Sequence, residues 1–339
     1  MQDADRRTPV KWAALRQRVL RWLPATFVVV AAGLAIYAVV RHGHDLRAAF
    51  AKLGALPLLE SLGLGLLGTY LVARVWIEIV RGLGARPPLY SSTRAYFVSQ
   101  LGKYVPGSVW PALAQMEYGR RTKIGRMTML NANMTALALN VAVGLAVAAA
   151  CLPFAGPQAL RHFWWALLAL PFVLALLHPR VLPAALNPVL RRMRRTTIDQ
   201  RLPWSAVLRA AIWGVLSWIL FGLHLYVMAR VIDGDSWHLV AACIGGFALA
   251  SIAGILVIPV PAGAGIRDAV IVVTLAAVMS TSDALAIAIA SRVLLILTDL
   301  ILGAGHGAIP QRRRSTVDRP RADRVIAPSS DAQPGSRGT

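Results

Sequence analysis

Charged residues are scarce in this sequence. They make up only 15% of its 339 residues, whereas about a quarter is usual in a soluble globular domain. Hydrophobic residues reach 57%, and long apolar runs account for the excess, which excludes an ordinary soluble protein. We therefore predict an all-α fold, namely a polytopic helical bundle in a membrane.

Cysteine is nearly absent as well. Cys151 and Cys243 are the only two, and both lie inside or at the edge of an apolar run. This excludes a disulfide framework and a CxxC metal site. The sequence also lacks zinc-ligand spacings, a recognisable Ser-His-Asp set, DxD phosphate motifs and an ATP-binding motif. We expect no metal, no cofactor and no enzymatic activity.

Basic residues outnumber acidic residues by 36 to 15, which gives a net charge of +21. No basic-aromatic motif of the known nucleic-acid modules is present, so we predict no nucleic-acid partner. The basic residues lie mostly between and beside the apolar runs. One set of alternate connections holds 29 of them and the other set holds five. By the positive-inside rule, this asymmetry predicts cytoplasmic termini and an even number of spans.

Eight apolar runs are candidate membrane spans, because a helix needs roughly 20 apolar residues to cross the hydrocarbon core. They are residues 23–40, 56–80, 127–150, 163–177, 207–232, 239–258, 266–279 and 285–305. Two of these runs are short, so six or seven spans are the alternatives to eight. The predicted organisation is a basic cytoplasmic N-terminus (1–22), a transmembrane domain (23–308) and a disordered cytoplasmic tail (309–339).

The segment from Ala95 to Gln115 is too apolar for a free loop. It contains Lys103, Pro106, Gly107 and Pro111. A straight spanning helix would have to accommodate these residues near its centre, where each is costly. We expect a broken or re-entrant helix, which a membrane tolerates only beside protein or a water-filled cavity. The alternative is an interfacial helix with Tyr104 and Trp110 at the level of the headgroups.

A second irregular segment, residues 258–268, reads Ile-Pro-Val-Pro-Ala-Gly-Ala-Gly-Ile-Arg-Asp. Two prolines and two glycines interrupt apolar sequence there, and Arg267 and Asp268 open the next helical run. Asp268 suits a helix N-terminus, where free amides and the helix dipole favour a carboxylate. The segment is either a tight turn between two spans or a second broken helix that faces the first.

Ionisable residues inside apolar runs are candidates for a functional site, because they are costly in lipid unless they are paired. Arg74 and Glu78 stand four residues apart on one helix face, where mutual neutralisation and a polar cavity are the alternatives. Arg292 and Asp299 lie two turns apart on one face of the last run. His224 is interpreted as a hydrogen-bonded packing residue rather than a proton relay.

The two irregular segments resemble segments of a known family. Residues 100–110, QLGKYVPGSVW, are similar to the GKY(I/V)PG-x-x-W segment of the transmembrane, flippase-like region of the lysylphosphatidylglycerol synthases. Residues 259–268, PVPAGAGIRD, are similar to the P-x-PGG-x-G-x-R-E segment of that region, with alanines at 262 and 264 and Asp268 in place of Glu. The resemblance covers about residues 20–308. It implies a stand-alone membrane module without the synthase's soluble aminoacyl-transfer domain.

The resemblance further implies that the protein binds a phospholipid, such as an aminoacylated phosphatidylglycerol, and moves it between the leaflets of a bacterial inner membrane. We expect both irregular segments to line the lipid cavity. The predicted contacts are Lys103 and Arg267 for the phosphate, Tyr104 and Trp110 for the glycerol and acyl boundary, Asp268 or Asp299 for a cationic headgroup, and Pro106, Gly107, Pro261, Gly263 and Gly265 in the cavity wall.

Two other hypotheses stay open. The protein could be a non-transporting partner that positions a membrane-bound, lipid-linked glycosyltransferase or synthase. A membrane enzyme that uses polyprenyl-phosphate or aminoacyl donors would need a catalytic acid or base that the motifs do not reveal. The sequence predicts a membrane phospholipid as the main partner and makes no prediction of the oligomeric state.

Overall fold

The computed structural model describes residues 52–104, 110–122, 124–156, 159–175, 177–178, 181–192, 202–256 and 265–308. Within these ranges all regular structure is helical, which confirms the predicted fold class. Of the two units of the chain, Met1–Ala308 and Ile309–Thr339, the first contains every described residue. The predicted first span and both terminal segments lie outside the described residues and stay predictions.

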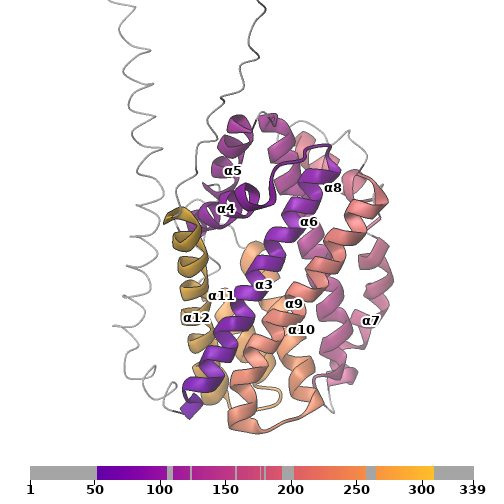
Figure 1. Ribbon diagram of the computed structural model, residues 1–339. Helices are drawn as coiled ribbons and strands as arrows, with labels where there is room; N and C mark the ends of the chain where they lie inside the picture. Colours follow the sequence, from indigo (N-terminus) through magenta and orange to yellow (C-terminus); the bar gives the residue numbers. More distant parts are fainter. Residues whose placement is uncertain are drawn as a thin grey trace, which may run out of the picture. The chain divides into compact units, whose positions relative to one another are not determined.

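Five described helices are long and apolar enough to cross a membrane, so the chain is a multi-pass membrane protein (Figure 1). They are α3 (Ala55–Gly82), α6 (Arg126–Cys151), α9 (Trp204–Asp233), α10 (Trp237–Leu256) and α12 (Thr281–Ala308). Two further predicted runs form the shorter helices α7 (Ala159–Ala175) and α11 (Ile266–Leu275). A short helix, α8 (Val181–Arg192), follows α7.

Ion pairs at the two ends of α3 define the directions of its neighbours. Lys52, just before α3, lies 3.2 Å from the carboxylate of Asp283 near the start of α12. Glu78, near the end of α3, lies 2.9 Å from Arg209 near the start of α9. Hence α12 runs parallel to α3 and α9 runs antiparallel to it. We call the end of the bundle that holds the end of α3 and the start of α9 the basic end.

Glycine allows the closest helix packing. A Cβ atom at Gly222 of α9 would lie 2.4 Å from the Cα atom of Ile244 in α10. Small residues serve this purpose in lipid, where the hydrophobic effect does not drive helices together. Polar contacts add to the packing, since Trp76 Nε1 of α3 donates a hydrogen bond of 2.7 Å to Asn133 Oδ1 of α6.

A helical hairpin lies at the basic end. It consists of α4 (Leu89–Gln100), the 3₁₀ turn η1 (Leu101–Tyr104) and α5 (Trp110–Arg121). Its arms contact each other, because Gln115 Nε2 donates a hydrogen bond of 2.8 Å to Ser99 Oγ and the hydroxyls of Ser91 and Tyr118 are 2.9 Å apart. The chain therefore reverses within the first irregular segment, as a hairpin rather than one straight helix.

Contacts with α12 measure how far this hairpin reaches into the bundle. Arg94 of α4 donates a hydrogen bond of 3.1 Å to the carbonyl of Gly307, close to the end of α12. Tyr104, at the end of η1, contacts Asp299, eight residues earlier in α12. At 1.5 Å per residue, the contact of Tyr104 lies about 12 Å deeper than that of Arg94. We call Lys103 and Tyr104 the hairpin tip.

Helix α11 begins inside the bundle and not at its end. It has ten residues, or about 15 Å of helix, roughly half the thickness of a hydrocarbon core. Its first turn contacts Arg292, about 17 Å along α12 from the first residue of that helix. From there α11 runs outward, and a short turn leads into α12. Gly265 and the first turn of α11, the described part of the second irregular segment, thus lie at depth, and we call them the α11 tip.

Candidate functional site

Asp299 of α12 is the meeting point of the hairpin and the bundle. Its carboxylate is buried, and its Oδ2 atom accepts a hydrogen bond of 2.5 Å from the hydroxyl of Tyr104. The ammonium of Lys103 lies 2.7 Å from the same oxygen. Two consecutive residues of the first motif therefore converge on the one acidic residue of the run 285–305.

A glycine in α12 lets the turn η1 pack so closely. A Cβ atom at Gly303 would lie 2.7 Å from Cδ1 of Leu101, the first residue of η1. Leu101 is fully buried against this bare stretch of α12. One helical turn away is Asp299, so the apolar contact holds Lys103 and Tyr104 at the carboxylate.

Asp268 occupies the start of α11, as its position in the sequence predicts. Its Oδ2 atom accepts a hydrogen bond of 3.0 Å from the backbone N–H of Gly265 and also pairs with the guanidinium of Arg292. Gly265 has φ of 83°, a left-handed conformation that glycine adopts without strain. The glycine and the carboxylate together start a helix in the interior of the bundle, where free amides need a partner.

Arg267, in the first turn of α11, interacts electrostatically with groups of both tips. Its guanidinium is 5.8 Å from the ring centroid of Phe247 in α10, and it interacts electrostatically with Asp268 and Asp299. The Nε atom of Arg267 is buried without a hydrogen-bond partner among the described residues, and so is Oδ1 of Asp268. Polar atoms in this state favour a polar ligand, because an unsatisfied buried donor or acceptor costs about 1–3 kcal/mol.

The described charges at the two tips do not cancel. Lys103, Arg267 and Arg292 supply three positive charges, whereas Asp268 and Asp299 supply two negative charges, which leaves one positive charge. Arg292 and Asp299 are seven residues apart on α12, or about 10 Å along its axis, and each faces one tip. The predicted shared face is confirmed, and the surplus charge suits an anionic group.

Four predicted site residues cannot be placed. Pro106, Gly107, Pro261 and Gly263 lie outside the described residues. Trp110 is described and is half-buried at the first position of α5. A Cβ atom at Gly102 would lie 2.9 Å from the Cβ atom of Trp110, so this indole begins the returning arm directly beside the turn. The ligand-binding roles of all these residues stay predictions.

A polar contact between three helices was not apparent from sequence patterns. His224 of α9 is fully buried, and its Nδ1 atom lies 2.7 Å from Ser61 Oγ of α3. Its Nε2 atom lies 3.0 Å from Ser291 Oγ, next to Arg292 in α12. His224 is hydrogen-bonded on both ring nitrogens, which agrees with the packing interpretation. The one sequence signal for this contact is that polar residues are rare in these spans, so that Ser61, His224 and Ser291 are candidates to meet.

The sequence of the chain matches one known protein family. The family model described as Lysylphosphatidylglycerol synthase TM region matches residues 22–303. The chain belongs to this family. The match includes both irregular segments and all the described helices except the last residues of α12, so the family resemblance of the two motifs is confirmed. A search of curated proteins finds no match to the chain.

Proposed function

We propose that this family member binds a phospholipid headgroup between the tips of the two interrupted helices and moves the lipid from one leaflet to the other. The observation that supports this function most directly is the pairing of Asp299 with Lys103 and Tyr104 at the hairpin tip, about 10 Å from the pairing of Asp268 with Arg292. Charged groups at such depth are typical of a substrate pathway.

Arg267 is the proposed phosphate contact. The guanidinium interacts electrostatically with Asp268 and Asp299, and its buried Nε atom has no hydrogen-bond partner among the described residues, so a phosphate oxygen that enters beside it would satisfy this donor. Guanidinium groups bind phosphate by paired, charge-assisted hydrogen bonds. Phe247 holds one face of this guanidinium and keeps it directed toward the tips.

Asp299 is the proposed contact for a cationic headgroup such as an aminoacyl amine. An ammonium that reaches Asp299 replaces Lys103, and the displaced Lys103 turns toward the lipid phosphate. The exchange conserves the number of ion pairs in the site, so the headgroup enters without leaving a buried carboxylate unpaired. The side chain of Lys103 is 36% exposed, so the exchange does not require it to leave a closed interior.

The two tips approach from opposite ends of the bundle, which provides a route for the headgroup. The hairpin extends inward from the basic end, and α11 starts at depth and runs to the other end. We propose that the basic end faces the cytoplasm of a bacterium and that the protein lies in the inner membrane, as the distribution of Lys and Arg predicts. The proposal assigns no covalent step to the site.

Lipid movement in reconstituted vesicles tests the proposal. Acyl-labelled fluorescent lipids with phosphatidylglycerol, lysylphosphatidylglycerol or phosphatidylcholine headgroups are quenched from outside by dithionite, and the protected fraction is followed with time. The expected result is faster movement of at least one of the first two lipids than in protein-free vesicles. D299N and R267Q should slow this movement at least tenfold.

Matched control variants lie at the end of the bundle opposite the basic end, away from both tips. Glu60 and Arg230 form an ion pair of 3.1 Å at the surface, and each is about 40% exposed. E60Q and R230Q therefore remove the same charges as the two site variants, and they should move lipid at the wild-type rate. Unchanged leaflet distribution of every major lipid in cells that lack the gene would contradict the proposal. Stoichiometric co-purification of a membrane enzyme, without lipid movement, would support the partner hypothesis instead.

A further inference from the structure

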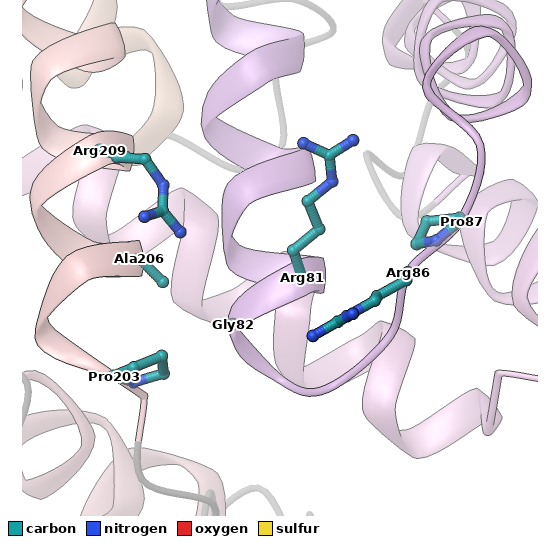
Figure 2. A pocket seen from close by; sticks show the side chains of 7 residues that line it. All are labelled: Arg81, Gly82, Arg86, Pro87, Pro203, Ala206 and Arg209. Atoms are coloured by element: carbon teal, nitrogen blue, oxygen red, sulfur yellow. The ribbon is translucent and has the colours of Figure 1, made fainter.

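A second charged feature lies at the basic end, away from the interrupted helices. It is a cavity of about 410 Å³ between the end of α3, the following loop and the start of α9. Its lining residues are Arg81, Gly82, Arg86, Pro87, Pro203, Ala206 and Arg209. We call it the arginine pocket. Figure 2 shows the side chains of Arg86 and Arg209 reaching from opposite sides toward the space beside Gly82.

The wall of the arginine pocket is held by close backbone packing. A Cβ atom at Gly82 would lie 2.8 Å from the Cβ atom of Ala206 and 3.0 Å from Cδ2 of Leu202. The end of α3 therefore rests directly on the first turn of α9. Pro203 precedes that first turn and fixes its backbone, so the side of the pocket formed by α9 is rigid.

The positive charges of the arginine pocket exceed the charge available to neutralise them. Arg81 and Arg209 both pair with Glu78, at 3.4 and 2.9 Å, and Arg74 pairs with the same carboxylate at 3.4 Å. Arg86 has no ion-pair or hydrogen-bond partner within the described part of the chain. Four arginines, the three of the lining and Arg74, thus stand against one glutamate, which leaves three positive charges.

A role in membrane orientation alone does not explain this geometry. The positive-inside rule needs basic residues somewhere in a cytoplasmic connection, and it does not need three guanidinium groups around one cavity. Guanidinium groups repel one another unless an anion lies between them. Each guanidinium group has five N–H donors, and few acceptors lie near them. The oxygens of a phosphate can accept these hydrogen bonds.

The surroundings of the arginine pocket favour a lipid over a soluble anion. Trp204, next to Pro203, is 54% exposed, as expected of an aromatic residue at the level of the headgroups. Leu208 and Ile212 follow at helical spacing on the outer surface of α9, and both are about half exposed. These exposed apolar residues face lipid on the side of α9 away from Pro203 and Ala206, so the pocket lies beside a lipid-facing surface, at the level of the headgroups.

We propose that the arginine pocket binds the phosphate of an anionic phospholipid headgroup, as a site separate from the one at the interrupted helices. Basic pockets between spanning helices on the cytoplasmic side are suited to phosphate-rich headgroups such as cardiolipin. The surplus positive charge at the pocket suits the two phosphates of such a lipid. This binding does not depend on lipid movement, and it holds even if the protein transports nothing.

Native mass spectrometry of the delipidated full chain tests this proposal. Cardiolipin, phosphatidylglycerol or phosphatidylcholine is added in mixed micelles, and the bound lipids are counted at each concentration. We expect one cardiolipin to bind at least tenfold more tightly than phosphatidylcholine. The double variant R86Q/R209Q should lose this preference, because loss of a charge-assisted hydrogen bond costs about 1.5–3 kcal/mol, or roughly tenfold or more in affinity.

Two further variants keep the test decisive. R86Q alone removes a side chain that has no described partner, so it should fold normally and still weaken cardiolipin binding. R230Q removes the same charge from the opposite end of α9 and should bind cardiolipin as the wild type does. Unchanged binding by R86Q/R209Q would overturn the proposal. Binding of inorganic phosphate that R86Q/R209Q abolishes, with no preference among the lipids, would overturn the assignment to a lipid.

Discussion

Lys103 Nζ lies 2.7 Å from Asp299 Oδ2, and this ion pair connects the tip of a helical hairpin to the deep part of the last span. The carboxylate is only 4% exposed, whereas the lysine side chain is 36% exposed. One partner is thus buried in the bundle, while the other is partly exposed. The pair stabilises the packed hairpin and keeps the cation at a partly exposed position, which suits the exchange proposed for a lipid headgroup.

We expect D299N to destabilise the protein by about 2–3 kcal/mol. The substitution leaves Lys103 without its carboxylate, and loss of one partner of a buried pair costs about 3–5 kcal/mol, less here because the lysine is partly exposed. Thermal unfolding in detergent measures the change. The double variant K103M/D299N should recover at least half of the loss, since the uncompensated charge is gone. Equal stability of the single and double variants would show that the ion pair is unimportant.

We expect Y104F to lower stability by about 1–2 kcal/mol without a change of charge. The phenol donates its hydrogen bond to a buried carboxylate, and hydrogen bonds to charged groups contribute about 1.5–3 kcal/mol. Amide hydrogen exchange of residues 96–104 should become faster than that of α9. If exchange increased equally in all helices, the hydroxyl would not act locally at the tip.

We expect G222A to destabilise the bundle by about 2 kcal/mol or more. The added methyl group would lie 2.4 Å from the backbone of Ile244, so α9 and α10 must move apart. G63A is the matched control, because a Cβ atom at Gly63 of α3 meets nothing within 4 Å. It should be neutral or stabilising by up to about 1 kcal/mol, since alanine favours a helix. Similar melting temperatures of the two variants would be inconsistent with this packing.

We expect R120A to raise the pKa of Glu117, at the end of the hairpin's second arm. The hydrogen bond from Arg120, with a weaker one from Arg121, lowers the pKa of the Glu117 carboxyl from 4.5 to about 2. Because the folded pKa lies below the ordinary value, this contact favours the folded arm above about pH 4.5 and is lost as the pH falls toward 2. Its effect on stability should be small, since both arginines are more than half exposed.

Carboxyl NMR of glutamate-labelled protein in nanodiscs measures this pKa. The sequence contains just three glutamates, so E117Q assigns the signal directly. In R120A the midpoint should move upward, toward 4.5. R94A is the control, because Arg94 also lies on the hairpin but contacts the carbonyl of Gly307 instead of Glu117. An equal upward movement in R94A would indicate a general change of the hairpin rather than the local pair.

The sequence determined the helices themselves. Apolar runs of sufficient length predict α3, α6, α9, α10 and α12 within a few residues, because a spanning segment must satisfy its backbone hydrogen bonds internally. The i,i+4 spacing of Arg74 and Glu78 likewise predicts a pair, and the two lie 3.4 Å apart. Asp268 at a helix start and the shared face of Arg292 and Asp299 follow from the same helical geometry.

Only the tertiary structure decided which of these residues meet. Lys103 and Asp299 are 196 residues apart in the sequence. Arg209 pairs with Glu78, which also pairs with Arg81, and no sequence pattern predicts that α9 contributes this arginine. Such contacts depend on how helices pack, and packing depends on where glycines such as Gly82 and Gly303 let backbones approach. Helical periodicity is a local property of the chain, whereas the choice of partner across the bundle is set by the fit of whole surfaces.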